Sequence, residues 1–210
     1  MKVAKVEYAG RSAPAVIAGS DARIIGPWME APALASGFDL TSLSIHELKA
    51  RSAGSTTSIP VGNVAFGAPK GPQTKVICVG LNYQSHAEET QGKVGRVPSM
   101  FMKTRDAPVG QGEALCRPKA SECFDYEGEI AVVIGKPGRH IAKADAMEHV
   151  FGYTITMDGS VRDHLIPTVG KNFWRSGALG PWIVTADEIP DPQQLRIETR
   201  LSGSLKCAVA

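Results

Sequence analysis

Short apolar segments separated by turn residues run through almost the whole chain of 210 residues. The first three, at residues 3–8, 15–17 and 23–25, are rich in valine, isoleucine and alanine and are separated by Gly10 and by residues 19–21. Apolar segments bounded in this way are typical of strands. The pattern predicts a small β-meander at the start of the chain, and the 22 glycines and 14 prolines indicate many turns.

The same periodicity predicts further strands and a few helices along the chain. Strands are expected at residues 75–79, 127–134, 153–157, 179–184 and 195–201, and helices at 43–50, 82–89 and 143–150. Residues 53–74 are rich in Gly, Ser, Thr and Pro, which favours a boundary there. We therefore expect an α+β, β-rich fold with a small N-terminal domain and linker at 1–70 and a catalytic domain at 71–210.

Charge and composition exclude several classes of protein. The 23 Lys and Arg against 21 Asp and Glu give a net charge of +2, far from the basic excess of nucleic-acid binders. No apolar run approaches the ~20 residues that span a bilayer, and Lys2, Lys5 and Glu7 interrupt any export signal. Four cysteines without a CxxC pair favour a reduced, cytoplasmic setting. We expect neither a nucleic-acid nor a membrane partner.

Acidic residues gather at the start of one predicted strand and the end of another. Because side chains alternate along a strand, Glu127 and Glu129 project to the same side, about 7 Å apart. Such a pair is either a solvent-facing strand edge or a site for a hard cation, and the spacing leaves both open. Asp158 follows the strand at 153–157 and is either a turn or N-cap residue or a third carboxylate of that site.

Other ionisable residues have both a catalytic and a structural interpretation. A helical turn after Asp158 would let Arg162 pair with it or grip a substrate carboxylate. His86 and Glu89, three residues apart, form either a general-base dyad or a surface pair. Lys171, beside two aromatic residues, either stabilises an oxyanion or lies on the surface. The absence of P-loop, GxSxG, HExxH and GxGxxG motifs disfavours nucleotide binders, serine hydrolases and zincins.

Six short motifs follow one another along the second part of the chain. They are VGLNYQSHAEE at 79–89, PSMFMK at 98–103, DYEGEIAVVIG at 125–135, GYTITMDGSVRD at 152–163, GKNF at 170–173 and LGPW at 179–182. They occur in the order of the fumarylacetoacetate hydrolase family, and the stretch from about 75 to 203 resembles that family. The N-terminal meander is similar to the small domain that precedes the catalytic one in bacterial members.

The resemblance implies a β-rich roll of mixed sheets, a metal site and a homodimer formed through the catalytic domain. Glu127, Glu129 and Asp158 match the family's three carboxylate ligands of Mg²⁺ or Mn²⁺, with Ca²⁺ as a further candidate. Metal-dependent chemistry on a 2-oxo acid is therefore expected.

The resemblance also implies catalytic and substrate-binding residues. His86 and Glu89 match the dyad that activates water or shuttles a proton. Lys171 and Arg162 match groups that hold the substrate's carboxylate and oxo oxygens, and Lys103 matches a lysine near the same pocket.

The implied function is a divalent-metal-dependent hydrolase that cleaves a C–C bond in an acylpyruvate or related 2-oxo acid through a metal-stabilised enolate. An isomerase, decarboxylase or lyase on the same 2-oxo acid is the alternative. The chain departs from the family in the short segment 164–169, at Cys207 and at its end, Ala210, where relatives continue through further strands. A sheet incomplete at the C-terminus is therefore expected, and with it the further alternative of a truncated homologue that binds metal without turnover.

Overall fold

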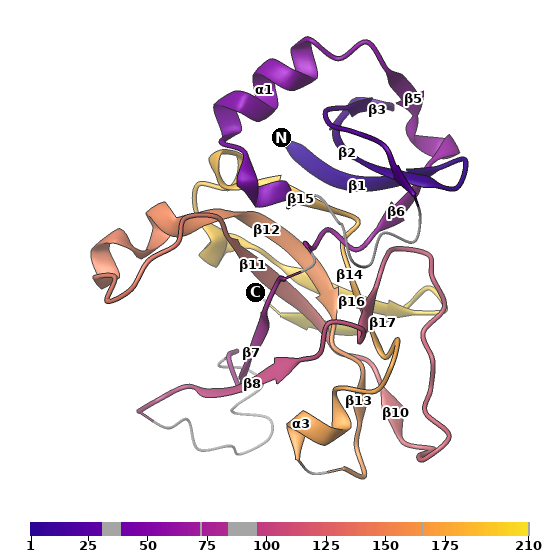
Figure 1. Ribbon diagram of the computed structural model, residues 1–210. Coiled ribbons are helices and arrows are strands. Elements are labelled where there is room, and N and C mark those ends of the chain that lie inside the picture. The colour runs from indigo at the N-terminus through magenta and orange to yellow at the C-terminus, as the bar shows by residue number, and fades with distance from the viewer. Residues whose placement is uncertain (31–38, 72, 84–95, 165, 210) are drawn as a thin grey trace.

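The computed structural model of the chain describes residues 1–30, 39–71, 73–83, 96–164 and 166–209, and strands dominate it (Figure 1). The predicted meander is confirmed as three antiparallel strands, β1 (Lys2–Tyr8), β2 (Arg11–Ala18) and β3 (Asp21–Ile24). Three short strands extend it: β4 (Met29–Glu30), β5 (Ser58–Pro60) and β6 (Ala65–Gly67). Its inward side chains, such as Ala4, Val6 and Ala15, are fully buried.

The first predicted helix is confirmed as α1 (Ile45–Ala53). It begins at a capping box, in which the Ser44 hydroxyl accepts from the Glu47 amide and the Glu47 carboxylate accepts from the Ser44 amide. The 3₁₀ turns η1 (Leu40–Ser42) and η2 (Val61–Asn63) flank it along the chain. Leu48 of α1 is fully buried in one cluster with Val3 of β1 and Ile183, so the helix packs on side chains that are about 180 residues apart in the sequence.

The meander is part of one large mixed sheet. The later strands of this sheet are β9 (Pro108–Val109), β11 (Gly128–Ile134), β12 (Val150–Met157), β14 (Gly177–Leu179) and β15 (Trp182–Thr185). Because β1 pairs with β2 on one side and with β15 on the other, the sheet runs in the order β5-β3-β2-β1-β15-β12-β14-β9, with β11 paired to β12 outside that order. The expected β-rich fold with a mixed sheet is confirmed, and the boundary near residue 70 stays a prediction.

Smaller ribbons and turns surround the lower end of the large sheet in Figure 1. The ribbons pair β7 (Val76–Gly80) with β8 (Ser99–Lys103), β10 (Phe124–Asp125) with β13 (Ser160–Val161), and β16 (Ile197–Leu201) with β17 (Ser204–Val209). The short helical segments are α3 (Pro167–Gly170), η3 (Lys143–His149), η4 (Ala186–Glu188) and η5 (Pro192–Gln194).

Two predicted elements differ in the structure. The helix expected at 143–150 is the 3₁₀ helix η3, which buries only His149 and so has no apolar face to hold an α-helix in place. The strand expected at 179–184 is divided into β14 and β15 at Gly180–Pro181, because Gly180 has a φ of 122° and proline has no amide hydrogen for a ladder.

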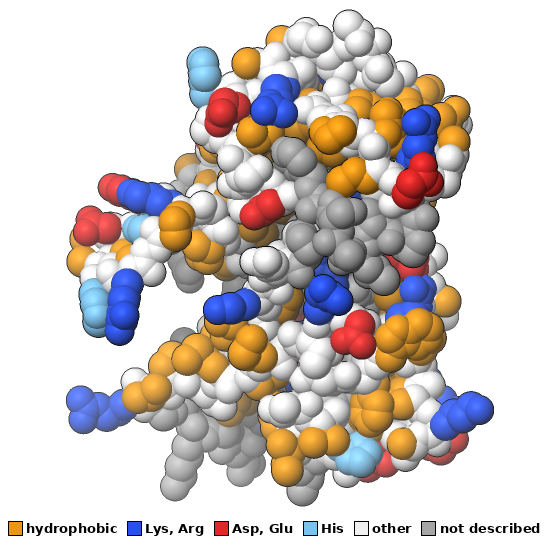
Figure 2. All heavy atoms as spheres, in the orientation of Figure 1, with side chains coloured by type: hydrophobic (Ala, Val, Ile, Leu, Met, Phe, Trp, Pro, Cys, Tyr) orange, Lys and Arg blue, Asp and Glu red, His pale blue; other side chains and the backbone are white. Residues whose placement is uncertain are grey.

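Several apolar side chains remain exposed on the ribbon of β7 and β8, where hydrophobic atoms gather in Figure 2. Ile77, Val79, Met100 and Met102 are all more than two fifths exposed. Among the helices that the structure describes, none is long and apolar enough to cross a membrane.

The joint between β12 and β15 leads to a prediction about stability. A Cβ at Gly152 would lie 2.2 Å from the carbonyl oxygen of Val184. We expect Gly152→Ala to lower the free energy of unfolding by about 1–3 kcal/mol, because the strands must separate to accept the methyl group. Urea denaturation measures this. Gly62→Ala is the control, because no atom lies within 4 Å of the added Cβ; equal losses in both variants would contradict the prediction.

Candidate functional site

The pairing of β11 with β12 places the predicted carboxylates at the same end of one strand pair. The Asp158 amide donates to the Glu127 carbonyl at 2.8 Å, and along the ladder Glu129 lies opposite Thr156. Residues directly opposite each other in an antiparallel pair share a face, and so do residues two apart in one strand. Glu127, Glu129 and Asp158 are therefore carried on one face at one end of this strand pair.

Asp158 and Gly159 link β12 to β13. A Cβ at Gly159 would lie 1.8 Å from the Ser176 carbonyl oxygen, so only glycine fits beside the backbone of Ser176. The helical turn expected after Asp158 is wrong, because the chain enters β13 and pairs with β10. The Ser160 hydroxyl donates to the Asp158 carbonyl at 3.0 Å, and Asp158 as a whole is 5% exposed.

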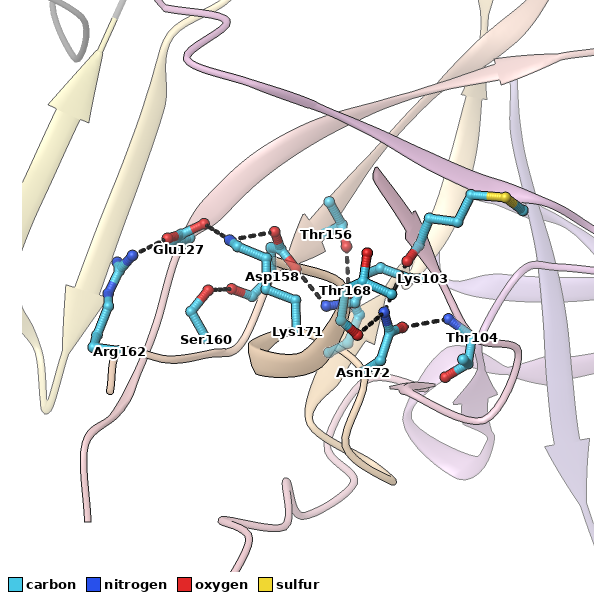
Figure 3. A network of polar contacts seen from close by, with 12 residues as sticks. Lys103, Thr104, Glu127, Thr156, Asp158, Ser160, Arg162, Thr168, Lys171 and Asn172 are labelled. Carbon is cyan, nitrogen blue, oxygen red and sulfur yellow. Dashed lines mark hydrogen bonds and ion pairs between the residues drawn. The ribbon is translucent and has the colours of Figure 1, made fainter. Parts of the chain in front are cut away.

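Lys171 joins two of the carboxylates, as Figure 3 shows. Its Nζ donates to Glu127 Oε2 at 2.5 Å and to Asp158 Oδ2 at 2.8 Å. Burial alone would lower the pKa of this ammonium, but the hydrogen bonds to Asp158 and Glu127 outweigh burial and raise its pKa. With only 15% of its side chain exposed, Lys171 is a member of the site and not a surface lysine.

The backbone beside Lys171 is fixed by α3 and by Asn172. The Lys171 amide donates to the Pro167 carbonyl at 3.0 Å, which closes the turn of α3. The Asn172 side chain donates to the Met102 carbonyl at 2.8 Å and accepts from the Thr104 amide at 2.5 Å. Sequence reasoning missed Asn172, whose only signal is its place beside Lys171 in the GKNF motif.

Lys103 is the buried partner of Asp158. Its Nζ forms an ion pair with Asp158 Oδ1, and the exposed fractions of the two side chains are 2% and 7%. The sequence places Lys103 among the substrate-binding residues, whereas the structure shows its ammonium turned to a carboxylate and away from solvent. A buried ammonium needs such a partner, because an unpaired charge is costly to remove from water.

Arg162 binds two carboxylates, neither of which is Asp158. Its Nε and Nη2 donate to Asp125 Oδ2 at 2.9 and 2.8 Å, and its Nη1 lies 2.6 Å from Glu127 Oε1. The i,i+4 pairing with Asp158, one of the two alternatives from the sequence, is not formed, because β13 is extended and places Arg162 on the other side of Glu127 (Figure 3). Half of the Arg162 side chain is exposed, so its guanidinium borders the solvent at this site.

Glu129 is the least compensated of the three carboxylates. Burial raises the pKa of its carboxyl above the ordinary value, the negative charges of Glu127 and Asp158 raise the pKa further, and a hydrogen bond with Tyr83 and the charge of Lys171 oppose the shift. Burial and Glu129 in turn raise the pKa of the Tyr83 phenol to about 12. Tyr83 is a second residue that sequence reasoning missed, although it stands inside the first motif of the resemblance.

The predicted dyad of His86 and Glu89 lies outside the described residues, as does most of the helix expected at 82–89. Its role stays a prediction from the sequence.

The donor set has the chemistry that Mg²⁺ or Mn²⁺ requires, because all its side-chain ligands are carboxylate oxygens. Burial, and after it the negative charges of Glu127 and Asp158, raise the pKa of Glu129, and a bound cation would offset both effects. Within the described parts of the chain, no three His, Cys, Asp or Glu residues converge closely enough to hold a metal ion. The Lys171 ammonium occupies the position between Glu127 and Asp158 instead.

Comparison with known sequences bears on the same part of the chain. The family described as Fumarylacetoacetate (FAA) hydrolase C-terminal matches residues 75–208. The oxaloacetate tautomerase Fahd2a of rat mitochondria is 41% identical over 152 residues, which are 70% of this chain and 49% of the rat protein. The chain thus matches about half the length of this relative.

Solved structures share the fold. A 2-hydroxyhepta-2,4-diene-1,7-dioate isomerase from Mycobacterium marinum is 26% identical with a TM-score of 0.74, over 99% of this chain and 74% of that one. A maleylpyruvate hydrolase from Sphingobium, solved with manganese(II) and pyruvate, is 24% identical with a TM-score of 0.75, over 100% of this chain and 76% of that one. With a family match over most of the chain and six motifs in order, the chain belongs to the fumarylacetoacetate hydrolase family.

Proposed function

We propose that this chain carries a divalent-metal-dependent active site that acts on a 2-oxo acid, and that its reaction is keto–enol tautomerisation. The observation that carries the proposal is the convergence of Glu127, Asp158 and Lys171 at one end of the β11–β12 pair. The sequence favours hydrolysis first. The 41% identity to an oxaloacetate tautomerase moves the preference to tautomerisation, the isomerase alternative on the same substrate class.

Glu127, Glu129 and Asp158 would hold Mg²⁺ or Mn²⁺. When bound, such a cation supplies Lewis-acid polarisation of the substrate's 2-oxo oxygen. Oxygen-only ligands, the clustering of negative charge at Glu129 and a manganese-containing maleylpyruvate hydrolase of the same fold support this assignment.

Two cationic side chains at the site suit an anionic substrate. Arg162 is half exposed and presents a planar fork of donors, which suits a carboxylate. Lys171 is an ammonium donor near the same carboxylates and would stabilise negative charge on the oxo oxygen as the enol forms. His86 and Glu89 remain the predicted groups for moving a proton to or from carbon.

Hydrolytic C–C cleavage of an acylpyruvate is the second candidate, supported by the fold shared with a maleylpyruvate hydrolase. It would use the same groups at the 2-oxo acid and would in addition need an activated water, for which His86 is the predicted base. Decarboxylase or lyase activity on the same substrate class, the homodimer and the cytoplasmic setting stay predictions from the sequence.

The proposed site predicts metal-dependent turnover. The conversion of oxaloacetate from enol to keto form can be measured by the loss of enol absorbance. This conversion should stop after chelation and return when Mg²⁺ or Mn²⁺ is added. We expect Asp158→Asn to lower kcat/KM by about 100-fold or more, since a charged ligand and a partner of both lysines are lost. The matched control is Asp145→Asn, at an exposed position of η3.

Unchanged turnover after exhaustive metal removal would contradict the metal-dependent mechanism. Incubation with an acylpyruvate separates the two reactions, because only cleavage releases two acids that NMR can detect. Metal binding with neither reaction would favour the homologue without turnover.

The raised pKa of Glu129 predicts a pH dependence of stability in the metal-free protein. A carboxyl whose pKa is raised by folding binds its proton more tightly in the folded state. Its contribution to the free energy of unfolding is therefore present below the ordinary Glu pKa of about 4.3, and it is lost as pH rises through the folded value. In chelator, Glu129→Gln should be more stable than wild type at neutral pH, and the gap should close below about pH 4.

Thermal unfolding across this pH range measures the effect. Glu198→Gln is the control, because ion pairing with Arg200 lowers the pKa of Glu198 and the variant should gain no stability at neutral pH. A Glu129→Gln variant that is less stable than wild type at neutral pH would show that its charge is compensated after all.

A further inference from the structure

Two lysines hold the two oxygens of Asp158, and they differ in their surroundings. Lys103 pairs with Oδ1 and is 2% exposed, whereas Lys171 pairs with Oδ2 and is 15% exposed (Figure 3). Within the described residues, the Lys103 side chain has Asp158 as its single polar partner, while Lys171 also bonds Glu127 at 2.5 Å. Lys103 is thus a buried partner of one carboxylate, and Lys171 is a bridge between two.

The bridge takes up the oxygens that a metal would need. Glu127 Oε2 and Asp158 Oδ2 both accept from the same Nζ, so that one ammonium stands where two predicted metal ligands face each other. A cation bound by both carboxylates would compete for those oxygens. Lys103 bonds the other oxygen of Asp158, Oδ1, so it is Lys171 that occupies Oδ2.

The side chain of Lys171 has the freedom to leave, although its backbone does not. The α3 turn and the contacts of Asn172 fix the backbone at this point, as described above. A lysine side chain is a flexible four-carbon stem that ends in a strongly hydrated ammonium, so the ammonium can move while the Cα stays in place. The centroid of the Phe101 ring lies 5.3 Å from Nζ, so the cation already faces this ring in the bridging position.

We propose that the Lys171 ammonium is an internal counter-cation. It holds Glu127 and Asp158 together in the metal-free protein, and a divalent cation displaces it from these carboxylates. The displaced ammonium then faces the substrate's oxygens. This inference rests on the proposed function, because it takes Glu127 and Asp158 as ligands of the metal.

Loss of the Lys171 ammonium should strengthen metal binding, because the cation no longer has to displace it. Free Mn²⁺ measured by electron paramagnetic resonance gives the affinity without any turnover. Lys171→Met should bind Mn²⁺ about tenfold or more tightly than wild type, because two charge-assisted hydrogen bonds no longer have to be broken. Lys171→Arg keeps the cation and should bind Mn²⁺ no more tightly than wild type.

A second control separates displacement from the mere presence of positive charge. Arg162→Gln also removes one cation that touches Glu127, but it contacts the other oxygen, Oε1, and does not bridge to Asp158. We expect its Mn²⁺ affinity to change by less than about threefold. Lys171→Gln is a further neutral variant for use if the methionine variant folds poorly, and it should show the same tightening.

Thermal unfolding supplies the independent readout. In chelator, Lys171→Met should melt below wild type, since Glu127 and Asp158 then repel each other without a bridge, and Mn²⁺ should raise its Tm by more than it raises that of wild type.

Three results would contradict these expectations. If wild type binds Mn²⁺ and both neutral Lys171 variants bind it no more tightly, the counter-cation is overturned and the proposed function stands. Equal tightening in Arg162→Gln would overturn it as well. Failure of every variant to bind Mn²⁺ would overturn the proposed metal site and the inference together.

Discussion

The antiparallel pairing of β11 with β12 is the interaction on which the site depends. Its register sets Glu127 opposite Asp158, through the hydrogen bond from the Asp158 amide to the Glu127 carbonyl, and keeps Glu129 on the same face. A shift by one residue would turn Glu127 and Glu129 to the opposite face, because the side-chain period of a strand is two. The same β12 pairs with β15, which joins the site to the N-terminal meander.

Charge balance is the second constraint, and it explains why so many cations surround three acids. Carboxylates carried on one face repel each other, and burial makes that repulsion stronger. Lys103 pairs with Asp158 in the protein interior, and Lys171 bridges Asp158 and Glu127. Arg162 pairs with Glu127 from the solvent side. Among the described residues, Glu129 has the Tyr83 hydrogen bond and the more distant charge of Lys171, and burial together with the charges of Glu127 and Asp158 raises its pKa despite them.

Local sequence signals predicted the fold where the stabilising interactions are local. The meander has strand-like segments with turn residues between them, and α1 has a capping box within four residues of sequence, so both are confirmed. The failures have a local cause too: η3 lacks a buried apolar face, and Gly180–Pro181 interrupts what reads as one strand. The helical turn expected after Asp158 gave way to β13, because pairing with β10 is a contact across more than 30 residues of sequence.

The sequence by itself determined the family, the strand-rich class and the identity of the acids and lysines, because ordered motifs and period-two patterns survive without coordinates. Only the tertiary structure decided which of these groups meet. It paired Lys103 with Asp158 in the interior, placed Lys171 between two carboxylates, and paired Arg162 with Asp125. The partners in each ion pair, Lys103 with Asp158 and Glu127 with Lys171, are distant in the sequence. Strand register and side-chain burial decide whether such residues touch, and no local pattern encodes either of them.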